Sequence, residues 1–130
     1  MPPLTLSVLK PSLAIHRFSP DTPLPAQLIE EPLFFVARTA DELSVVCRAD
    51  LKLEGGRMDR GWSAIQVAGP LDFSLTGILA NIARVLAEAQ ISIFAVSTFD
   101  TDYVLVKSDR LARAQAVLKN AGYHFTADDS

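Results

Sequence analysis

The stretch that decides the fold is residues 69–107, GPLDFSLTGILANIARVLAEAQISIFAVSTFDTDYVLVK. From Thr76 onward its apolar residues recur at helical spacing, which predicts an amphipathic helix. The residues on the predicted apolar face are Ile78, Ile82, Val85, Leu86 and Ala89. Residues 91–98 and 103–107 are rich in β-branched and apolar types, and polar turn residues separate them. This pattern predicts a helix followed by a β-hairpin.

The flanking segments complete a recurring unit. A strand is predicted at residues 62–68, where Gly69-Pro70 ends it. After the hairpin, a second helix begins at Ser108 or Asp109 and stops at Gly122, and a short strand of residues 123–126 follows. The order is therefore β-α-β-β-α-β. Two right-handed crossovers place both helices on one face of an antiparallel sheet, which is the α+β, ferredoxin-like arrangement.

The first 60 residues contain shorter elements of the same kinds. Strands are predicted at residues 4–9, 12–18, 33–38 and 43–49. The segment Thr39–Glu42 matches a helix capping box, so one helical turn is expected there. These elements suit an abbreviated copy of the same unit, without a full second helix, although no residue-level repeat is visible. We therefore expect an abbreviated N-terminal unit at residues 1–60 and a complete domain at residues 61–130.

Composition narrows the class of protein. The chain has 130 residues, of which 49% are hydrophobic and 21% charged, and its formal net charge is −3. These values are those of a globular protein, and the mildly acidic charge argues against nucleic-acid binding. The single cysteine, Cys47, excludes an intrachain disulfide, and the N-terminal residues lack the pattern of a signal peptide. We therefore expect a soluble cytoplasmic protein that does not bind membranes.

Catalytic and metal-binding motifs are missing from the sequence. It contains no G-x-S-x-G, HExxH, CxxC or Walker pattern. Asp100 and Asp102 supply too few oxygens for Ca²⁺, and His16 and His124 are isolated from other ligand types. Cys47 lies in an apolar run and is expected to be a buried structural thiol. The sequence therefore predicts neither an enzyme nor a metal site nor a cofactor.

Three segments carry a family resemblance: TADELSVV at 39–46, LDFSLTGIL at 71–79 and STFDTDYVLV at 97–106. Together they resemble the ACT domain, and in particular the small two-unit bacterial ACT proteins. They are also similar to the tandem ACT regulatory regions of aspartate kinases and of the animal cytosolic arginine sensors. The resemblance covers most of the chain and is strongest from residue 62 onward. It implies a regulatory module that binds an amino acid or similar metabolite where two units meet, and that associates side by side.

The resemblance also implies which residues contact the ligand. They comprise a loop before the first helix, the end of the following strand, and a segment lent by the other unit. In this sequence the positions are Leu75, Thr76, Gly77 and Ile78, then Thr98, Phe99 and Asp102, and finally Ser44 and Val45. Some sensors of a basic ligand carry an acidic residue just before the Thr or Cys of the loop. Here that position is Leu75, so the resemblance does not favour arginine as the ligand.

These residue types suit a zwitterionic ligand. The amides that open a helix have no intrahelical partner and attract a carboxylate, and Gly77 lets a ligand approach the backbone. Asp102 can pair with an ammonium group. A simpler interpretation is that Gly77 permits close packing of helix and sheet, while Asp100 and Asp102 are ordinary turn residues. Both interpretations are compatible with the sequence.

The sequence leaves four candidate functions open. The first is a metabolite sensor that acts on a partner protein. The second is a ligand-free ACT-type dimerisation or interaction module. The third is RNA binding, because the RRM has the same element order, but the chain lacks the basic and aromatic RNP pattern. The fourth is a small enzyme without a recognisable motif. The open edges of a ferredoxin-like sheet favour a homodimer.

Overall fold

A computed structural model describes residues 4–67 and 77–126. Within it the chain forms two compact units. The larger unit contains the described residues of Met1–Lys10 and Ser63–Ser130, and the smaller unit is Pro11–Trp62. One strand, β5 (Arg57–Val67), contributes its first half to the smaller unit and its second half to the larger one.

The larger unit combines strands and two helices in the predicted order. It contains β1 (Thr5–Val8), the end of β5, α1 (Ile78–Glu88), β6 (Ile93–Ser97), β7 (Asp102–Lys107), the short 3₁₀ helix η2 (Ser108–Arg110), α2 (Leu111–Asn120) and β8 (His124–Phe125). Its strands lie in the order β8-β1-β5-β7-β6. From β5 to β8, the β-α-β-β-α-β order expected from the sequence is confirmed, and the unit has the ferredoxin-like arrangement.

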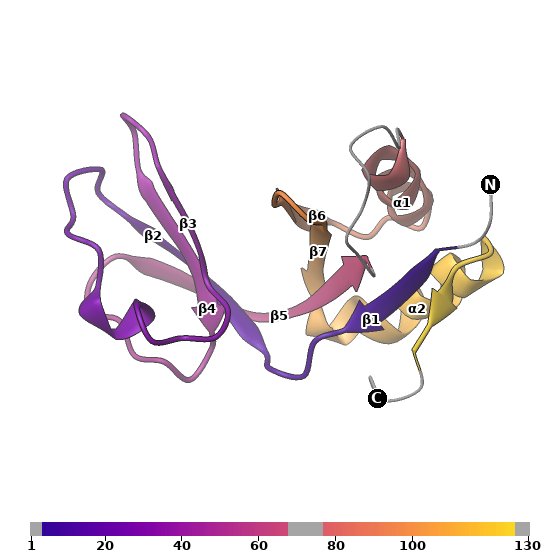
Figure 1. Cartoon of the computed structure of the whole chain (residues 1–130), viewed down its shortest axis with the longest axis horizontal. Helices are drawn as coiled ribbons and strands as arrows, with labels where there is room; N and C mark the ends of the chain where they lie inside the picture. Colours follow the sequence, from indigo (N-terminus) through magenta and orange to yellow (C-terminus); the bar gives the residue numbers. More distant parts are fainter. Residues whose placement is uncertain (1–3, 68–76, 127–130) are drawn as a thin grey trace. The chain divides into compact units, whose positions relative to one another are not determined.

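The position of β1 differs from the prediction. The sequence predicts residues 4–9 as part of the N-terminal unit, but β1 lies between β5 and β8 (Figure 1), antiparallel to β5 and parallel to β8. The sheet is therefore mixed and not antiparallel. The physical reason is complementary burial: Leu6 pairs with Val67 and Val8 with Ile65, so all four side chains enter one core. Alternation of apolar and polar residues predicts a strand, but it does not identify the strand with which it pairs.

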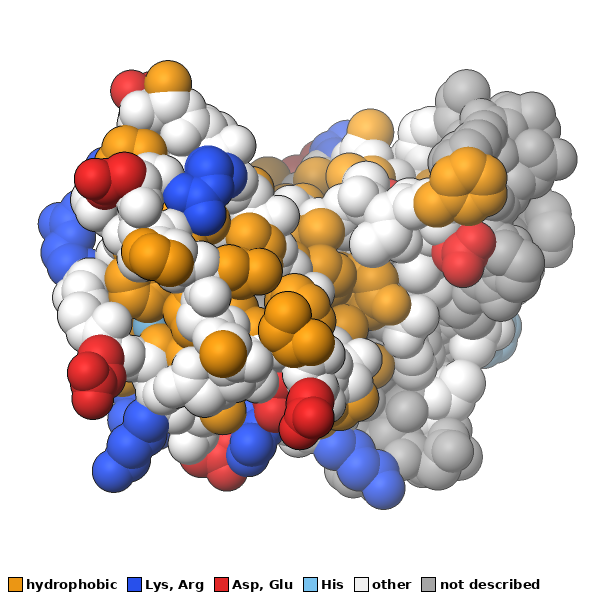
Figure 2. Space-filling model, turned by 60° about the vertical axis from the view of Figure 1, so that its left-hand side comes forward, with side chains coloured by type: hydrophobic (Ala, Val, Ile, Leu, Met, Phe, Trp, Pro, Cys, Tyr) orange, Lys and Arg blue, Asp and Glu red, His pale blue; other side chains and the backbone are white. Residues whose placement is uncertain are grey.

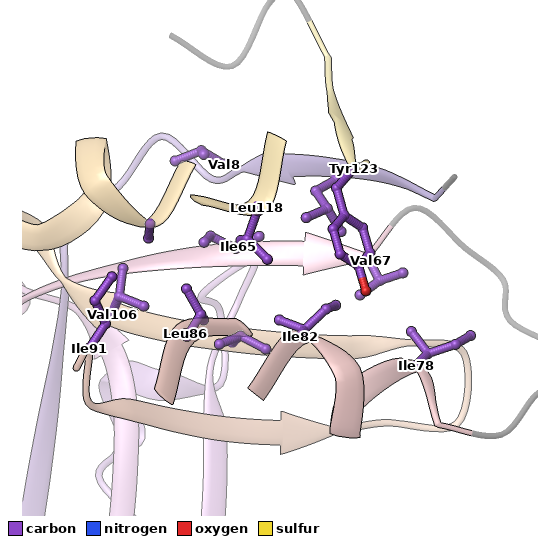
Figure 3. Packing of buried hydrophobic residues seen from close by; sticks show 13 residues of the cluster. Val8, Ile65, Val67, Ile78, Ile82, Leu86, Ile91, Val106, Leu118 and Tyr123 are labelled. Carbon is purple, nitrogen blue, oxygen red and sulfur yellow. The ribbon is translucent and has the colours of Figure 1, made fainter. Parts of the chain in front are cut away.

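Both helices cover the same face of this sheet. Ile78, Ile82 and Leu86 of α1 are buried, and they meet side chains from the strands and from α2 (Figure 3). The buried partners are Leu6, Val8, Ile65, Val67, Ile91, Val104, Val106, Ala114, Leu118 and Tyr123. The predicted apolar face of α1 is confirmed, with Val85 and Ala89 partly buried at its margin. Packing of this face, and not helix propensity, therefore holds α1 in place.

The smaller unit is an antiparallel sheet with the strand order β3-β4-β2-β5. Its other elements are β2 (Leu13–Phe18), the 3₁₀ helix η1 (Ala26–Leu28), β3 (Phe35–Arg38) and β4 (Leu43–Arg48). The helical turn expected at Thr39–Glu42 is instead the turn of the β3–β4 hairpin. Thr39 Oγ1 accepts hydrogen bonds from the amides of Asp41 and Glu42, as in a capping box, but the chain returns as a strand.

One face of the smaller sheet carries the core of its unit. Buried Phe18, Leu28, Leu43, Val45 and Cys47 pack there, and burial raises the pKa of the Cys47 thiol. His16 is only 2% exposed and stacks on Phe18 with ring centroids 5.8 Å apart. Among the described residues its Nε2 has no hydrogen-bond partner, and burial lowers the pKa of the imidazole. Burial therefore disfavours the charged form of His16 inside the unit.

Two adjacent glycines provide a test of packing in the smaller unit. Gly55 and Gly56 both have positive φ, so alanine at either position adds backbone strain of about 1–2 kcal/mol. A Cβ on Gly56 would lie 2.5 Å from the Arg17 carbonyl oxygen and 2.6 Å from the Phe18 ring, whereas one on Gly55 meets open space. We predict that Gly56→Ala lowers the free energy of unfolding by about 2–4 kcal/mol and Gly55→Ala by about half of that. Urea unfolding of both variants measures the difference between their free energies of unfolding. Equal losses would show that the close approach of Gly56 to Arg17 and Phe18 does not affect stability.

The buried histidine predicts a pH dependence of stability. Because the folded pKa of His16 lies below the ordinary imidazole value of 6.5, the unfolded state binds the proton first as the pH falls. The contribution is complete above pH 6.5 and is lost below it, by at most about 1.4 kcal/mol per pH unit. Urea unfolding between pH 7.5 and pH 5 should show this loss in the parent protein and a weaker dependence in His16→Phe. An identical slope in both proteins would exclude His16 as the cause.

Candidate functional site

The predicted loop residues lead into the first turn of α1. Leu75 and Thr76 lie outside the described residues. Gly77 is the exposed N-cap of α1, with φ +80° and no side-chain hydrogen bond to the helix. Ile78 is buried in the core, so its side chain faces the sheet and only its backbone is placed to contact a ligand. Figure 3 shows Ile78 at the same end of the unit as Val67, the last residue of β5.

The β6–β7 turn is fixed to this end of the sheet by a buried threonine. Thr101 is 5% exposed, and its Oγ1 donates a hydrogen bond to the carbonyl oxygen of Val67 at 2.6 Å. The Thr98 amide donates to the Thr101 carbonyl oxygen at 2.8 Å, and the Thr101 amide donates to Thr98 Oγ1 at 3.2 Å. The turn is therefore pinned to the end of β5, where the chain departs toward α1.

Two of the predicted residues in the turn are open to solvent. Thr98 is exposed, and Phe99 is 80% exposed at the tip of the turn. Asp102 accepts a hydrogen bond from Ser97 Oγ at 2.6 Å, which orients its carboxylate. Within the described parts of the chain no lysine, arginine or histidine pairs with Asp102. Its negative charge is therefore available to a cationic group of a ligand.

The start of α1 supplies the opposite polarity. The amide of Asn81 makes the first intrahelical hydrogen bond, to the Gly77 carbonyl oxygen at 2.8 Å. The amides of residues 78–80 precede it, and such amides have no partner inside a helix. The first turn of α1 carries no acidic side chain, so the partial positive charge of the helix end is not neutralised within that turn. The larger unit thus offers backbone donors from α1 and a carboxylate from Asp102.

The two remaining predicted residues belong to β4 of the smaller unit. Val45 is fully buried in the core of that unit, between His16 and Val36 on the neighbouring strands. Its side chain is therefore not open to a ligand. Ser44 points to the other face of the sheet, where its Oγ donates to Glu42 Oε1 at 2.8 Å. Of the two, Ser44 is the residue with an accessible polar group.

Sequence reasoning missed the residue that fixes the site. Thr101 lies in a polar turn between Asp100 and Asp102, and nothing in its local pattern separates it from an ordinary turn residue. Its role depends on Val67, which is 34 residues away in the chain. A hydrogen bond between distant segments leaves no periodic signal in the sequence, so only the fold reveals it.

The described residues do not provide the features of several other kinds of site. No group of three His, Cys, Asp or Glu residues in residues 4–67 and 77–126 could hold a metal ion. No helix in the same ranges has the length and apolar character of a membrane span. On the face drawn in Figure 2, basic and acidic side chains are interspersed among hydrophobic ones. That face offers no continuous basic surface to a phosphate backbone.

Comparison with known proteins connects this geometry to a family. The model of the ACT domain matches residues 57–120. Human cytosolic arginine sensor for mTORC1 subunit 1 is 41% identical over 59 residues, which are 45% of this chain and 18% of the sensor. The chain thus spans less than one fifth of the length of this curated relative. These matches are to regulatory ACT regions and not to catalytic domains.

Solved structures extend the likeness over the whole chain. Protein Atu0741 from Agobacterium tumefaciens is 37% identical, with a TM-score of 0.89, and the match covers 97% of this chain and 94% of that protein. The regulatory subunit of aspartate kinase from Thermus thermophilus shares the fold at 13% identity, with a TM-score of 0.64 and coverage of 90% and 97%. Fold, family model and relatives agree, and the chain belongs to the ACT-domain proteins.

Proposed function

We propose that the protein is a regulatory module that binds an amino acid or similar small metabolite and acts through a partner protein. The observation that carries the proposal is the attachment of the β6–β7 turn to Val67 by Thr101. Asp102 directly follows Thr101 in the chain. The attachment therefore also fixes the position of the Asp102 carboxylate relative to the end of β5. A zwitterionic ligand has the complementary charges.

The proposed binding mode divides the ligand between two groups. The α-carboxylate is received by the amides that open α1 at Gly77, where the helix dipole favours negative charge. The α-ammonium group pairs with Asp102, whose orientation Ser97 fixes. We propose that Leu75, Thr76, Ile78, Thr98 and Phe99 also contribute to this site, and that β4 contributes the hydroxyl of Ser44 and only the backbone of Val45, because the Val45 side chain is buried.

Which amino acid binds depends on the protein residues that lie next to the side chain of the ligand. The human relative is named an arginine sensor. In this chain the position before Thr76 is Leu75, which cannot neutralise a guanidinium group. Arginine therefore enters as one member of a full amino-acid panel and not as the favoured ligand.

The proposed role is regulatory and not enzymatic. The sequence carries no G-x-S-x-G, HExxH, CxxC or Walker motif, and the buried Cys47 has a raised thiol pKa that disfavours the reactive thiolate. We place the protein in the cytoplasm, the compartment printed in the name of the curated relative. A homodimer is part of the proposal, because β6 pairs only with β7 among the described strands and so has one open edge.

The open edge of β6 also favours the second candidate, an ACT-type dimerisation module that has no ligand. The two candidates differ in their response to metabolites. A ligand-dependent change of stability supports the sensor. A dimer in sedimentation equilibrium whose stability no metabolite changes supports the interaction module.

A thermal-unfolding screen against the proteinogenic amino acids tests the proposed function. A ligand at about 100 times its Kd adds about 2.7 kcal/mol, which raises Tm by on the order of 10 °C at this size. Asp102→Asn should abolish the shift, because the amide keeps the hydrogen bond from Ser97 but loses the charge. Asp100→Asn, two residues away in the same turn, is the matched control and should retain it. Failure of every amino acid to stabilise the protein would reject the sensor.

The buried threonine predicts an effect on binding without contact to the ligand. Thr101→Val keeps the shape but leaves the Val67 carbonyl without its hydrogen bond, at a cost of about 1–3 kcal/mol in stability. Amide hydrogen exchange at Thr98 should become faster, because its acceptor is the carbonyl of Thr101. Thr101→Ser keeps the hydroxyl and should restore slow exchange and ligand affinity. Equal exchange in the valine and serine variants would show that the hydroxyl does not fix the turn.

A further inference from the structure

The smaller unit has an open groove that the proposed function does not use. It contains about 600 Å³ of space and is lined by Pro11, Ser12, Arg48, Ala49, Asp50, Arg60 and Gly61. All seven residues belong to the Pro11–Trp62 unit. A space of this size is in the range of small-molecule sites.

A β-bulge shapes this groove. Trp62 pairs with Leu13 and Asp59 pairs with Ile15, so two residues of β5 oppose one residue of β2. One of the two is Gly61, whose φ of +81° is typical of a glycine bulge. Apart from Gly61 itself and its two chain neighbours, no described residue has an atom within 4 Å of the position that a Cβ on Gly61 would occupy, so the bulge faces open space. A bulge of this kind bends the bulged strand and increases its local twist.

Arg48 is held from two sides, and the two contacts differ in exposure. Its Nε donates to Glu31 Oε1 at 2.8 Å, and the Glu31 side chain is only 11% exposed. Its Nη1 donates to Asp50 Oδ1 at 3.0 Å, and the Asp50 side chain is 76% exposed. The hydrogen bond to Glu31 and the charge of Asp50 raise the pKa of Arg48. The inner contact therefore fixes a permanent cation, while the outer contact is a solvated ion pair of the kind that exchanges readily.

A second guanidinium group reaches the same turn from β5. Arg60 donates to the carbonyl oxygen of Ala49 at 3.2 Å, and Ala49 is the residue between Arg48 and Asp50. Two arginines from different strands thus line one groove. Planar guanidinium groups match a carboxylate with two parallel donors, and they keep their charge at every physiological pH.

The charges in the groove select the class of ligand. Among the lining residues, Arg48 and Arg60 carry two positive charges and Asp50 carries one negative charge, so the lining itself has an excess of positive charge. Asp50 already occupies the position of a carboxylate on the exposed edge of Arg48. We propose that the groove binds a small molecule through one carboxylate group, which displaces Asp50 from Arg48 and is also held by Arg60. This site is separate from the proposed amino-acid site, which depends on Asp102 and α1.

Binding of propionate, measured by NMR on the full chain at constant ionic strength, tests the proposal. Propionate should produce saturable shifts of the Arg48 Nε–H and of the Gly61 amide, whereas propionamide and sodium chloride should not. Asp50→Asn removes the competing carboxylate, so the affinity for propionate should rise by roughly two- to fivefold. Arg60→Gln removes one charged donor pair and should weaken binding by at least about tenfold.

The matched control lies on α1 of the larger unit. Glu88 pairs with Arg84 at 3.2 Å on an exposed surface, so Glu88→Gln changes the net charge as Asp50→Asn does. It should leave the affinity for propionate unchanged. Three results would overturn the proposal: no saturable shift in the parent protein, weaker binding in Asp50→Asn, or an equal gain in Glu88→Gln. Asp50, Arg60 and Glu88 are exposed, so their variants are expected to fold, and dispersed amide spectra verify this.

Discussion

The constraint on which the structure depends is the pairing of β1 with the second half of β5. The two strands are antiparallel neighbours, and the Leu9 amide donates to the Ala64 carbonyl oxygen where the chain leaves β1. Residues 11–62 are therefore an insertion between two adjacent strands of one sheet. The larger unit cannot complete its core until both ends of the insertion have come together. Leu6, Val8, Ile65 and Val67, which α1 and α2 cover, are buried only in that arrangement.

This constraint also determines where the candidate site forms. β5 ends at Val67, and its last carbonyl accepts the hydroxyl of Thr101. The position of the β6–β7 turn, and with it the carboxylate of Asp102, thus depends on the register of β5. The buried Thr101 hydroxyl and the Val67 carbonyl satisfy each other through this hydrogen bond. Without the hydroxyl, the buried carbonyl would carry a desolvation penalty. Thr101 is therefore important for geometry even though its side chain is buried and cannot contact a ligand.

Much of the larger unit could be predicted from the sequence, because its signals are local. The 3.6-residue period of Ile78, Ile82 and Leu86 predicts the buried face of α1, and the pattern of residues 91–107 predicts the hairpin. The partner of β1 could not be predicted, because an alternating strand fits any apolar sheet face. The turn at Thr39 was misassigned for a related reason: the same threonine hydroxyl caps a helix or closes a hairpin, and the tertiary pairing of β3 with β4 decides between them.

The residues of the candidate sites divide in the same way, into those with a local sequence signal and those that depend on a distant partner. Family resemblance suggests the turn and the helix start, and of these the structure describes the turn, which carries the carboxylate of Asp102, and Gly77, which begins α1. Thr101, Arg48 and Arg60 were not singled out, because each acts through a partner on another segment. Single-sequence patterns register neighbours along the chain and not across a sheet. The buried side chain of Val45 illustrates the converse, because its position in a motif did not reveal that it faces the core.

Two aspartates show how neighbours decide the role of one residue type. Asp102 accepts a hydroxyl hydrogen bond from Ser97 and has no cationic partner among the described residues, so a bound cation would gain an unshared charge. Asp50 already shares the guanidinium of Arg48, so a cation gains little from it and an anion must displace it. Exposure alone does not distinguish the two, because both carboxylates can be reached by solvent. The charge that each carboxylate already faces is therefore what separates the two proposals, in which Asp102 binds a ligand and Asp50 is replaced by one.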